Sequence, residues 1–237
     1  MTDVQKNIHT HTHAYAHTHT LRTELDHIVV AATTLAEGRA WARECLGVDA
    51  VGGGKHDGLA THNTLLNLTG NRYLEIIAID PEAGAPDFPR WFGLDTPEVQ
   101  ALVAHGPRLI AWVARASGAD DAIEQLVAAP NYSASRVRSA TRADYRWRFA
   151  FTPDGARING GVLPHLIQWD SLVHPCERLP ECGVSLIALA LGAPEPEGTT
   201  ALLESFALAD EIVQVAQSVS PQLVAMLNTP LGRVVLD

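Results

Sequence analysis

Cysteine is scarce in this chain. The 237 residues include three cysteines, Cys45, Cys176 and Cys182, and an odd number does not indicate a disulfide framework. Cys45 falls in the apolar phase of an expected helix, where we expect it to pack. Cys176 and Cys182 flank a short loop and leave three interpretations open: free thiols, a disulfide bridge or a pair of metal ligands. Because cytosolic thiols usually stay reduced, free thiols are the expectation.

Lysine and long apolar segments are scarce as well. Lys6 and Lys55 are the only lysines among 17 basic residues, and the formal net charge is -10, which argues against a nucleic-acid partner. No apolar run approaches the roughly 20 residues that a membrane span needs. Residues 1–6 lack the basic-then-apolar order of a signal peptide. We therefore expect a cytoplasmic protein without a nucleic-acid or membrane partner.

The first 20 residues are biased in composition. Five histidines alternate there with threonine, alanine and tyrosine: His9, His11, His13, His17 and His19. One interpretation is a metal-scavenging arm, because neutral imidazole binds zinc, copper and nickel. The other, which we favour, is a disordered tail or a remnant of expression that is dispensable for folding. We therefore expect a tail over residues 1–20 and one domain over 21–237.

The rest of the chain repeats one order of elements. A strand over 25–30 is followed by a helix over 34–46, an alternating run over 61–68 and a strand over 73–77. The same order returns in a strand over 109–114, a helix over 120–127 and strands over 145–151 and 164–169, and a shorter round follows over 184–237. The spacing of roughly 80 residues suggests internal duplication. We expect modules over about 21–80, 107–171 and 184–237, joined by linkers over 81–107 and 171–183.

Several short motifs together resemble one protein family. They are Leu25-Asp26-His27-Ile28-Val29-Val30, Gly53-Gly54-Lys55-His56, Thr61-His62-Asn63, Tyr73-Leu74-Glu75-Ile76 and Leu163-Pro164-His165-Leu166-Ile167-Gln168-Trp169. As a set they resemble the glyoxalase-like members of the vicinal oxygen chelate superfamily. The resemblance implies an α+β fold in which repeated βαβββ modules form a cupped mixed sheet. Helices would cover its convex face, and a metal would sit in the cup.

The two-residue period of a strand tests this resemblance in the first module. Alternation places Leu25, His27 and Val29 on one face of the first strand. It also places Glu75 on the mixed face of the strand over 73–77, and Asn63 on the mixed face between them. We expect these residues to face the cup, with His27 and Glu75 as metal ligands and Glu75 also moving a proton. The resulting prediction is that His27 and Glu75 lie within a few ångströms of each other.

In the second module, alternation separates aromatic from polar side chains. We expect the aromatic face of the strand over 145–151 to be covered by helices, so that Arg146 and Arg148 point into the cup as a clamp for an anionic substrate. Matching the two closing strands puts Gln168 at the position of Glu75, as a third metal ligand, and makes His165 a packed residue. The opening strand over 109–112 offers no ligand, which departs from the family pattern.

The expected function follows from the resemblance. We expect a metal-dependent enzyme, of lyase, isomerase or dioxygenase type, that acts on a small oxygen-rich substrate in the cup. The divalent metal would be Zn, Ni, Fe or Mn, and His56 and Asn63 would bind substrate together with the two arginines. The alternative is a metal-free protein of the same fold that binds or sequesters a small molecule. A homodimer is among the expected assemblies.

Overall fold

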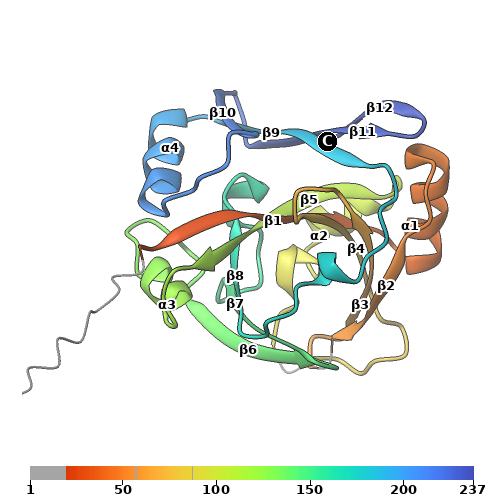
Figure 1. Cartoon of the computed structure of the whole chain (residues 1–237), viewed down its shortest axis with the longest axis horizontal. Helices are drawn as coiled ribbons and strands as arrows, with labels where there is room; N and C mark the ends of the chain where they lie inside the picture. Colours follow the sequence, from red (N-terminus) through yellow and green to blue (C-terminus); the bar gives the residue numbers. More distant parts are fainter. Residues whose placement is uncertain (1–19, 57, 87) are drawn as a thin grey trace, which may run out of the picture.

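One curled eight-stranded sheet forms a half-barrel at the centre of the molecule (Figure 1). The computed structural model describes residues 20–56, 58–86 and 88–237. Across the sheet the strands are β2 (Val51–His56), β3 (Thr61–Asn67), β4 (Tyr73–Ile79), β1 (Arg22–Ala31), β5 (Arg108–Ser117), β8 (His165–Trp169), β7 (Tyr145–Phe151) and β6 (Arg136–Arg142). The predicted α+β fold with a cupped mixed sheet is confirmed.

The half-barrel consists of two equivalent halves. In the first half β1 runs parallel to β4, and in the second half β5 runs parallel to β8 in the same way. The two opening strands, β1 and β5, pair antiparallel at the centre of the sheet. Parallel pairs need a crossover connection, and each half supplies one that contains a helix and a hairpin. The duplication expected from the sequence is therefore present in these two modules.

Helix α1 (Leu35–Trp41) covers the first module and continues as the π-helical turn η1 (Ala42–Leu46). The Oγ1 of Thr34 accepts a hydrogen bond from the backbone N–H of Glu37, which caps the start of the helix. Gly47 ends it at φ 74°, a left-handed conformation that glycine adopts without strain. Gly38 lies against Ile76 so closely that a Cβ would come within 2.4 Å of its side chain. The glycine therefore lets the helix lie directly on the sheet.

The third segment has the same order of elements but another topology. It contains β9 (Ser185–Ala193), α4 (Pro196–Ser205), β10 (Val213–Gln217), β11 (Gln222–Thr229) and β12 (Gly232–Leu236). These strands form a separate sheet in the order β10-β9-β11-β12. In the half-barrel each opening strand pairs with the fourth strand of its own module, whereas β9 pairs with the second and third strands of this segment. The third segment is therefore not a third copy of the module.

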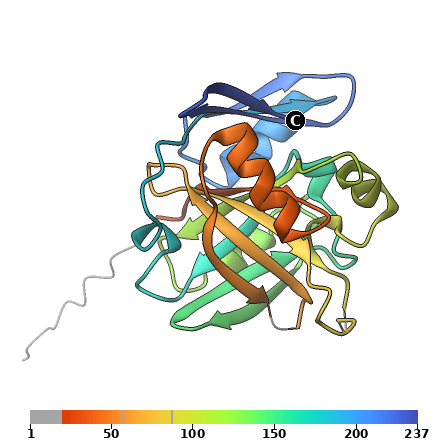
Figure 2. The same ribbon diagram turned by 90° about the vertical axis from the view of Figure 1, so that its right-hand side faces the viewer.

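The small sheet lies as a layer over the convex side of the half-barrel (Figures 1 and 2). Helix α3 (Ala122–Val127) covers the second module on the same side through contacts with β5, β7 and β8. Leu189, Leu191 and Ala225 of the small sheet belong to the same buried cluster as Ile28 and Trp112 of the half-barrel. As predicted, the third segment is an integral part of the core.

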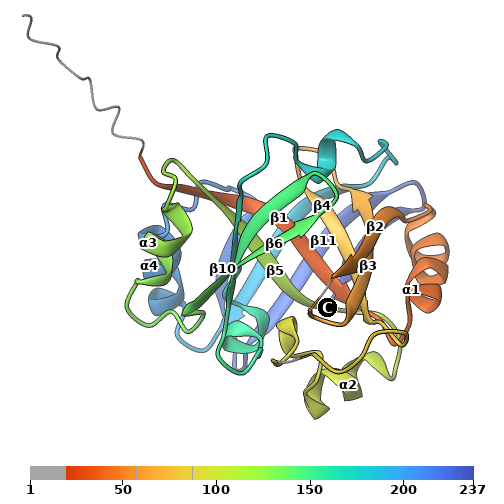
Figure 3. The ribbon, with the colours of Figure 1, turned by 90° about the horizontal axis from the view of Figure 1, so that it is seen from below.

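The linker over residues 81–107 fills part of the concave side. It contains the short turn η2 (Trp91–Gly93) and α2 (Pro97–Val103), which begins after a Thr96 cap and lies beside the half-barrel in Figure 3. Trp91 and Phe92 form a second buried cluster with aromatic side chains of the second module. Two further short turns, η3 (Ile158–Gly161) and η4 (Pro175–Glu177), connect the later strands. The cup is therefore a lined and partly filled space.

The remaining expectations about the chain have mixed outcomes. The histidine-rich residues 1–19 lie outside the described residues. Cys176 and Cys182 are free thiols, as expected, and so is Cys45, but Cys45 is exposed rather than packed. In the described ranges, no helix is long and apolar enough to cross a membrane.

Candidate functional site

A β-bulge in β1 organises the polar end of the cup. Leu25 pairs with Ala114 and His27 pairs with Val113, so Asp26 is an extra residue without a partner of its own. The bulge breaks the alternation of side chains along the strand. Leu25 therefore packs in the convex core, and the prediction that it faces the cup is wrong. Alternation resumes at His27, which faces the cup.

His27 and Glu75 face each other from neighbouring parallel strands. The Nε2 of His27 lies 3.6 Å from the Oε2 of Glu75, and only 3% and 4% of these two residues are exposed. The ring of His27 stacks on Tyr73 at 4.4 Å between centroids. The other carboxylate oxygen of Glu75, Oε1, accepts a hydrogen bond of 2.6 Å from the Nδ2 of Asn63. The predicted closeness of His27 and Glu75 is confirmed, while their roles stay predictions.

His56 and Arg142 complete the polar group. Burial, together with the nearby positive charge of Arg142, lowers the pKa of His56 to about 3. The imidazole is therefore neutral at pH 7. Its Nε2 lies 3.9 Å from the Oε1 of Glu75 and 3.4 Å from the Nη1 of Arg142, and its Nδ1 lies 2.9 Å from the Oγ1 of Thr61. The lone pair at Nε2 is thus directed at a guanidinium N–H.

Arg142 connects the two edges of the half-barrel. It lies at the end of β6, which is one edge strand, and reaches across to the hairpin of β2 and β3 at the other edge. Its Nη1 donates to the Oδ1 of Asn63 at 3.0 Å, and the backbone N–H of Gly54 donates to the same oxygen. Gly53, at φ 81°, has no room for a side chain, because a Cβ would lie 2.1 Å from the carbonyl oxygen of Asn63. Glycine at this position allows β2 to approach the site.

The polar groups and a set of aromatic residues enclose a cavity of about 30 Å³. Its lining residues are His27, His56, Asn63, Tyr73, Glu75, Trp91, Phe92, Arg142, Trp147, Phe149, Ile167 and Trp169. This volume holds about two water molecules. A larger ligand therefore enters only if lining side chains move.

The alternation argument assigned the wrong faces in the second module. Gln168 lies on the convex side, where its side chain bonds the backbone N–H of Ile123 and the carbonyl of Ala119 beside α3, so it does not reach the cup. Arg148 pairs with Asp170 and Glu124 on that side. Arg146 is exposed and does not line the cavity. The predictions that placed Gln168, Arg146 and Arg148 in the cup are therefore wrong.

The physical reason is the linker that fills the cup. We expected the aromatic side chains of β7 to need a helix over them, but Phe149 and Phe151 pack against Trp91 inside the cup, and Trp147 belongs to the same buried cluster. A strand pattern separates two faces but does not say which face is concave. Arg142 was missed for a similar reason, because nothing in its local sequence indicates that it reaches the opposite edge of the sheet.

His165 also faces the concave side but stays packed, as expected. Its ring lies between Phe92 and Phe149, and its Nδ1 lies 3.2 Å from the carbonyl oxygen of Ala150. Burial lowers the pKa of His165 to about 4. Its Nε2 has no hydrogen-bond partner among the described residues.

The side chains around His27 and Glu75 can be compared with the ligands of a catalytic metal site. In the first module Val29 pairs with Glu75, and His27 lies two residues before Val29. In the second module Arg115 pairs with Ile167, and Val113 lies two residues before Arg115. Val113 and Ile167 are therefore the counterparts of His27 and Glu75. Neither counterpart carries a ligand atom. Within the described ranges, no group of three or more His, Cys, Asp or Glu side chains is arranged to hold a metal. Because a catalytic zinc site draws about three ligands from the protein, this set does not fit a resident metal.

Two βαβββ modules that form one cup with polar residues at its floor define the vicinal oxygen chelate fold. A family model described as a glyoxalase-like domain matches residues 25–207. The chain therefore belongs to the glyoxalase-like family of that superfamily.

Comparison with solved structures finds similar chains at low sequence identity. A hypothetical protein from Staphylococcus aureus is 13% identical with a TM-score of 0.54, and the match covers 84% of this chain and 88% of that one. Methylmalonyl-CoA epimerase from Mycobacterium tuberculosis is 19% identical with a TM-score of 0.37, and the match covers 61% and 85% of the two chains. No curated protein matches the chain.

Proposed function

We propose that this protein is an enzyme that moves a proton on a small, oxygen-rich, anionic substrate in the cup. The observation that carries the proposal is the buried pairing of His27 with Glu75 at the floor of an aromatic-lined cavity. Burying an ionisable pair costs free energy that apolar side chains at the same positions do not cost. The second module fills its equivalent positions with Val113 and Ile167, so the fold does not require polar groups there.

Glu75 is the catalytic base in this proposal. Asn63 holds its Oε1, which leaves Oε2 directed toward His27 and the cavity. Oε2 takes a proton from a substrate carbon next to a carbonyl group. The electron pair of the C–H bond forms a C=C bond, and the π pair of the carbonyl group moves to its oxygen. In a 2-hydroxy ketone Glu75 then returns the proton to the former carbonyl carbon, while the proton of the substrate hydroxyl group moves to the former carbonyl oxygen. The step is an isomerisation and needs no oxidant or further reactant.

Arg142 is the group that holds the anionic part of the substrate. It is half-buried and lines the cavity, and no described carboxylate lies within ion-pair distance of it. A guanidinium offers a planar pair of N–H donors that matches a carboxylate or a phosphate. The anion clamp expected from Arg146 and Arg148 is thus assigned to Arg142. Its charge also favours the negative oxygen that forms when the proton leaves.

The metal-dependent chemistry expected from the family resemblance is not part of this proposal. The proposed steps use only groups of this chain, because the counterparts of His27 and Glu75 in the second module carry no ligand atoms. The second candidate function is a metal-free binding protein. The observation in its favour is that seven of the twelve residues lining the cavity are aromatic or aliphatic residues other than histidine: Tyr73, Trp91, Phe92, Trp147, Phe149, Ile167 and Trp169.

Proton exchange with solvent separates the two functions. The protein is incubated in D2O with small 2-oxo acids, 2-hydroxy ketones and malonate-type half-esters, and loss of the C–H signal is followed by proton NMR. We expect exchange with at least one compound class, and a decrease of about 10²- to 10⁴-fold in Glu75→Gln. Glu204→Gln, at an exposed position of α4, is the matched control and should exchange like wild type. Binding without exchange, unchanged in Glu75→Gln, would favour the binding protein.

A further inference from the structure

Asp26 is fully buried and does not take part in the chemistry proposed above. It is the extra residue of the bulge in β1, it has no exposed surface, and its Oδ1 lies 2.7 Å from the Nδ1 of His27. Residues next to each other in a regular strand point to opposite faces. The bulge is therefore what allows the carboxylate to bond the imidazole that follows it.

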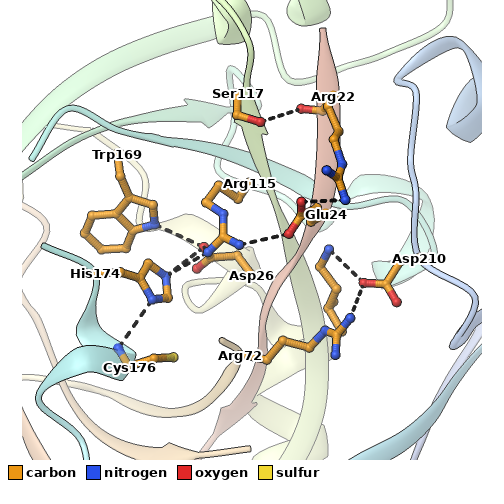
Figure 4. A network of polar contacts seen from close by, with 11 residues as sticks. Arg22, Glu24, Asp26, Arg72, Arg115, Ser117, Trp169, His174, Cys176 and Asp210 are labelled. Carbon is orange, nitrogen blue, oxygen red and sulfur yellow. Dashed lines mark hydrogen bonds and ion pairs between the residues drawn. The ribbon is translucent and has the colours of Figure 1, made fainter. Parts of the chain in front are cut away.

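The second oxygen of Asp26 is held from three other directions. Its Oδ2 accepts hydrogen bonds from the Nε1 of Trp169 at 3.0 Å and from the Nη1 of Arg115 at 3.3 Å, and it lies 3.0 Å from the Nε2 of His174 (Figure 4). Trp169 belongs to β8, Arg115 to β5 and His174 to the segment after β8. The backbone N–H of Cys176 donates to the Nδ1 of His174, so the proton of His174 is at Nε2 and is donated to Asp26.

These contacts fix the charge of Asp26 and the direction of each bond. Burial by itself raises the pKa of a carboxyl group, but the hydrogen bonds from His174 and His27 hold the pKa of Asp26 well below its ordinary value. An ionised carboxylate only accepts hydrogen bonds, so His27 donates its Nδ1–H to Asp26. Arg115 also bonds the carboxylate of Glu24, which continues the network away from the cup (Figure 4).

We propose that Asp26 is a positioning residue that holds the proton of His27 at Nδ1 and directs the bare Nε2 at Glu75 and the cavity. This role rests on the proposed function, in which the space beside Glu75 receives the substrate. Bare Nε2 accepts the proton of a substrate hydroxyl group, or receives the proton that Glu75 has taken. With the other tautomer, an N–H group would face the carboxylate and this acceptor would be lost. Substrates with a hydroxyl next to the reacting carbon are therefore favoured.

Nitrogen NMR of the histidine side chains in the full-length protein tests the assignment of the proton. Two-bond ¹H–¹⁵N correlations identify which ring nitrogen of His27 is protonated, and His27→Gln identifies its signals. In wild type we expect His27 to carry a proton at Nδ1 and none at Nε2. In Asp26→Asn we expect the Nε2–H form to appear, and exchange of a responsive compound in D2O to fall by about 10²-fold or more. Glu24→Gln, which alters the same network without touching His27, should leave both readouts unchanged.

The outcomes separate this inference from the proposed function. A wild-type proton at Nε2 would overturn the role of Asp26, and so would an equal change in Glu24→Gln. The wild-type spectrum is decisive even if Asp26→Asn does not fold. If the proton is at Nδ1 and moves in Asp26→Asn while no compound exchanges, the positioning by Asp26 stands and the proposed enzyme fails.

Discussion

The two modules of the half-barrel share one backbone plan but contribute different side chains to the cup. The first module supplies His27, His56, Asn63 and Glu75, all in contact with one another or with a shared neighbour. At the positions that match His27 and Glu75, the second module has Val113 and Ile167.

The difference shows which positions of a duplicated fold are constrained by packing and which are free to differ. A backbone repeat needs apolar packing on its convex side in both halves, and both halves have it. The concave side carries no such requirement, so its residues differ between the modules. We infer that the first module performs the chemistry, and that the second provides an apolar wall together with the anion-binding Arg142.

The largest expected effect on stability concerns the apolar wall that the second module contributes to the cup. Phe149 is 2% exposed and packs on Trp91, Phe92, Phe151 and His165, so Phe149→Ala should lower the free energy of unfolding by about 3–5 kcal/mol. Urea unfolding followed by tryptophan fluorescence measures it.

The matched change in the first module is Glu75→Gln. It keeps the shape of the side chain, and we expect a change in stability of no more than about 1 kcal/mol. Equal losses of stability in the two variants would contradict the division between a chemical half and a structural half.

The next effect is the pH dependence of stability to which His56 and His165 both contribute. The pKa is about 3 for His56 and about 4 for His165 in the folded protein, both below the unfolded value of about 6.5. Between these values the unfolded chain binds a proton that the folded chain does not, so stability falls as the pH falls from about 6.5. From pH 7 to about 4.5 we expect each histidine to cost roughly 2–3 kcal/mol.

His165→Asn tests this expectation, because the asparagine amide replaces the Nδ1–H donor without titrating. Its loss of stability between pH 7 and about 4.5 should be smaller than that of wild type by the contribution of one histidine. Exposed His105→Asn is the control and should behave like wild type. Identical pH profiles for all three proteins would show that His165 does not stay neutral in the folded state.

A smaller effect is expected for the anion clamp. Hydrogen bonds to charged groups contribute about 1.5–3 kcal/mol, so Arg142→Ala should weaken binding of a small dicarboxylate by roughly 10- to 150-fold in calorimetry. Arg146→Ala removes an exposed arginine of the same hairpin and should bind like wild type. Equal weakening in both variants would indicate a general charge effect, and no weakening in either would remove Arg142 from the site.

The smallest expected effect concerns metal removal. After deletion of residues 1–19, which carry five histidines, we expect substoichiometric zinc by elemental analysis and no change in proton exchange with EDTA. One tightly held metal per chain whose removal stops exchange would contradict the assignment of the chemistry to protein groups alone. It would instead support the prediction that His27 and Glu75 bind a catalytic metal.

Local sequence was sufficient for the repeat in the first two modules, for most of their elements and for half of the site. Strand periodicity put His27, Asn63 and Glu75 on one face, because a regular strand alternates its side chains whatever surrounds it. It also predicted that the aromatic side chains of β7 share one face. The family resemblance then supplied the cup, and the structure and the family match agree with it.

Only the tertiary structure decided the rest. The bulge at Asp26 depends on how β1 pairs with β5, and pairing partners lie far apart in the sequence. Which face of β7 is concave depended on where Trp91 and Phe92 pack, and Arg142 reaches Asn63 only because the sheet curls until the side chain can span the space between its two edges. Alternation along a strand is local physics, whereas curvature, register and the filling of a cup are set by contacts between distant segments.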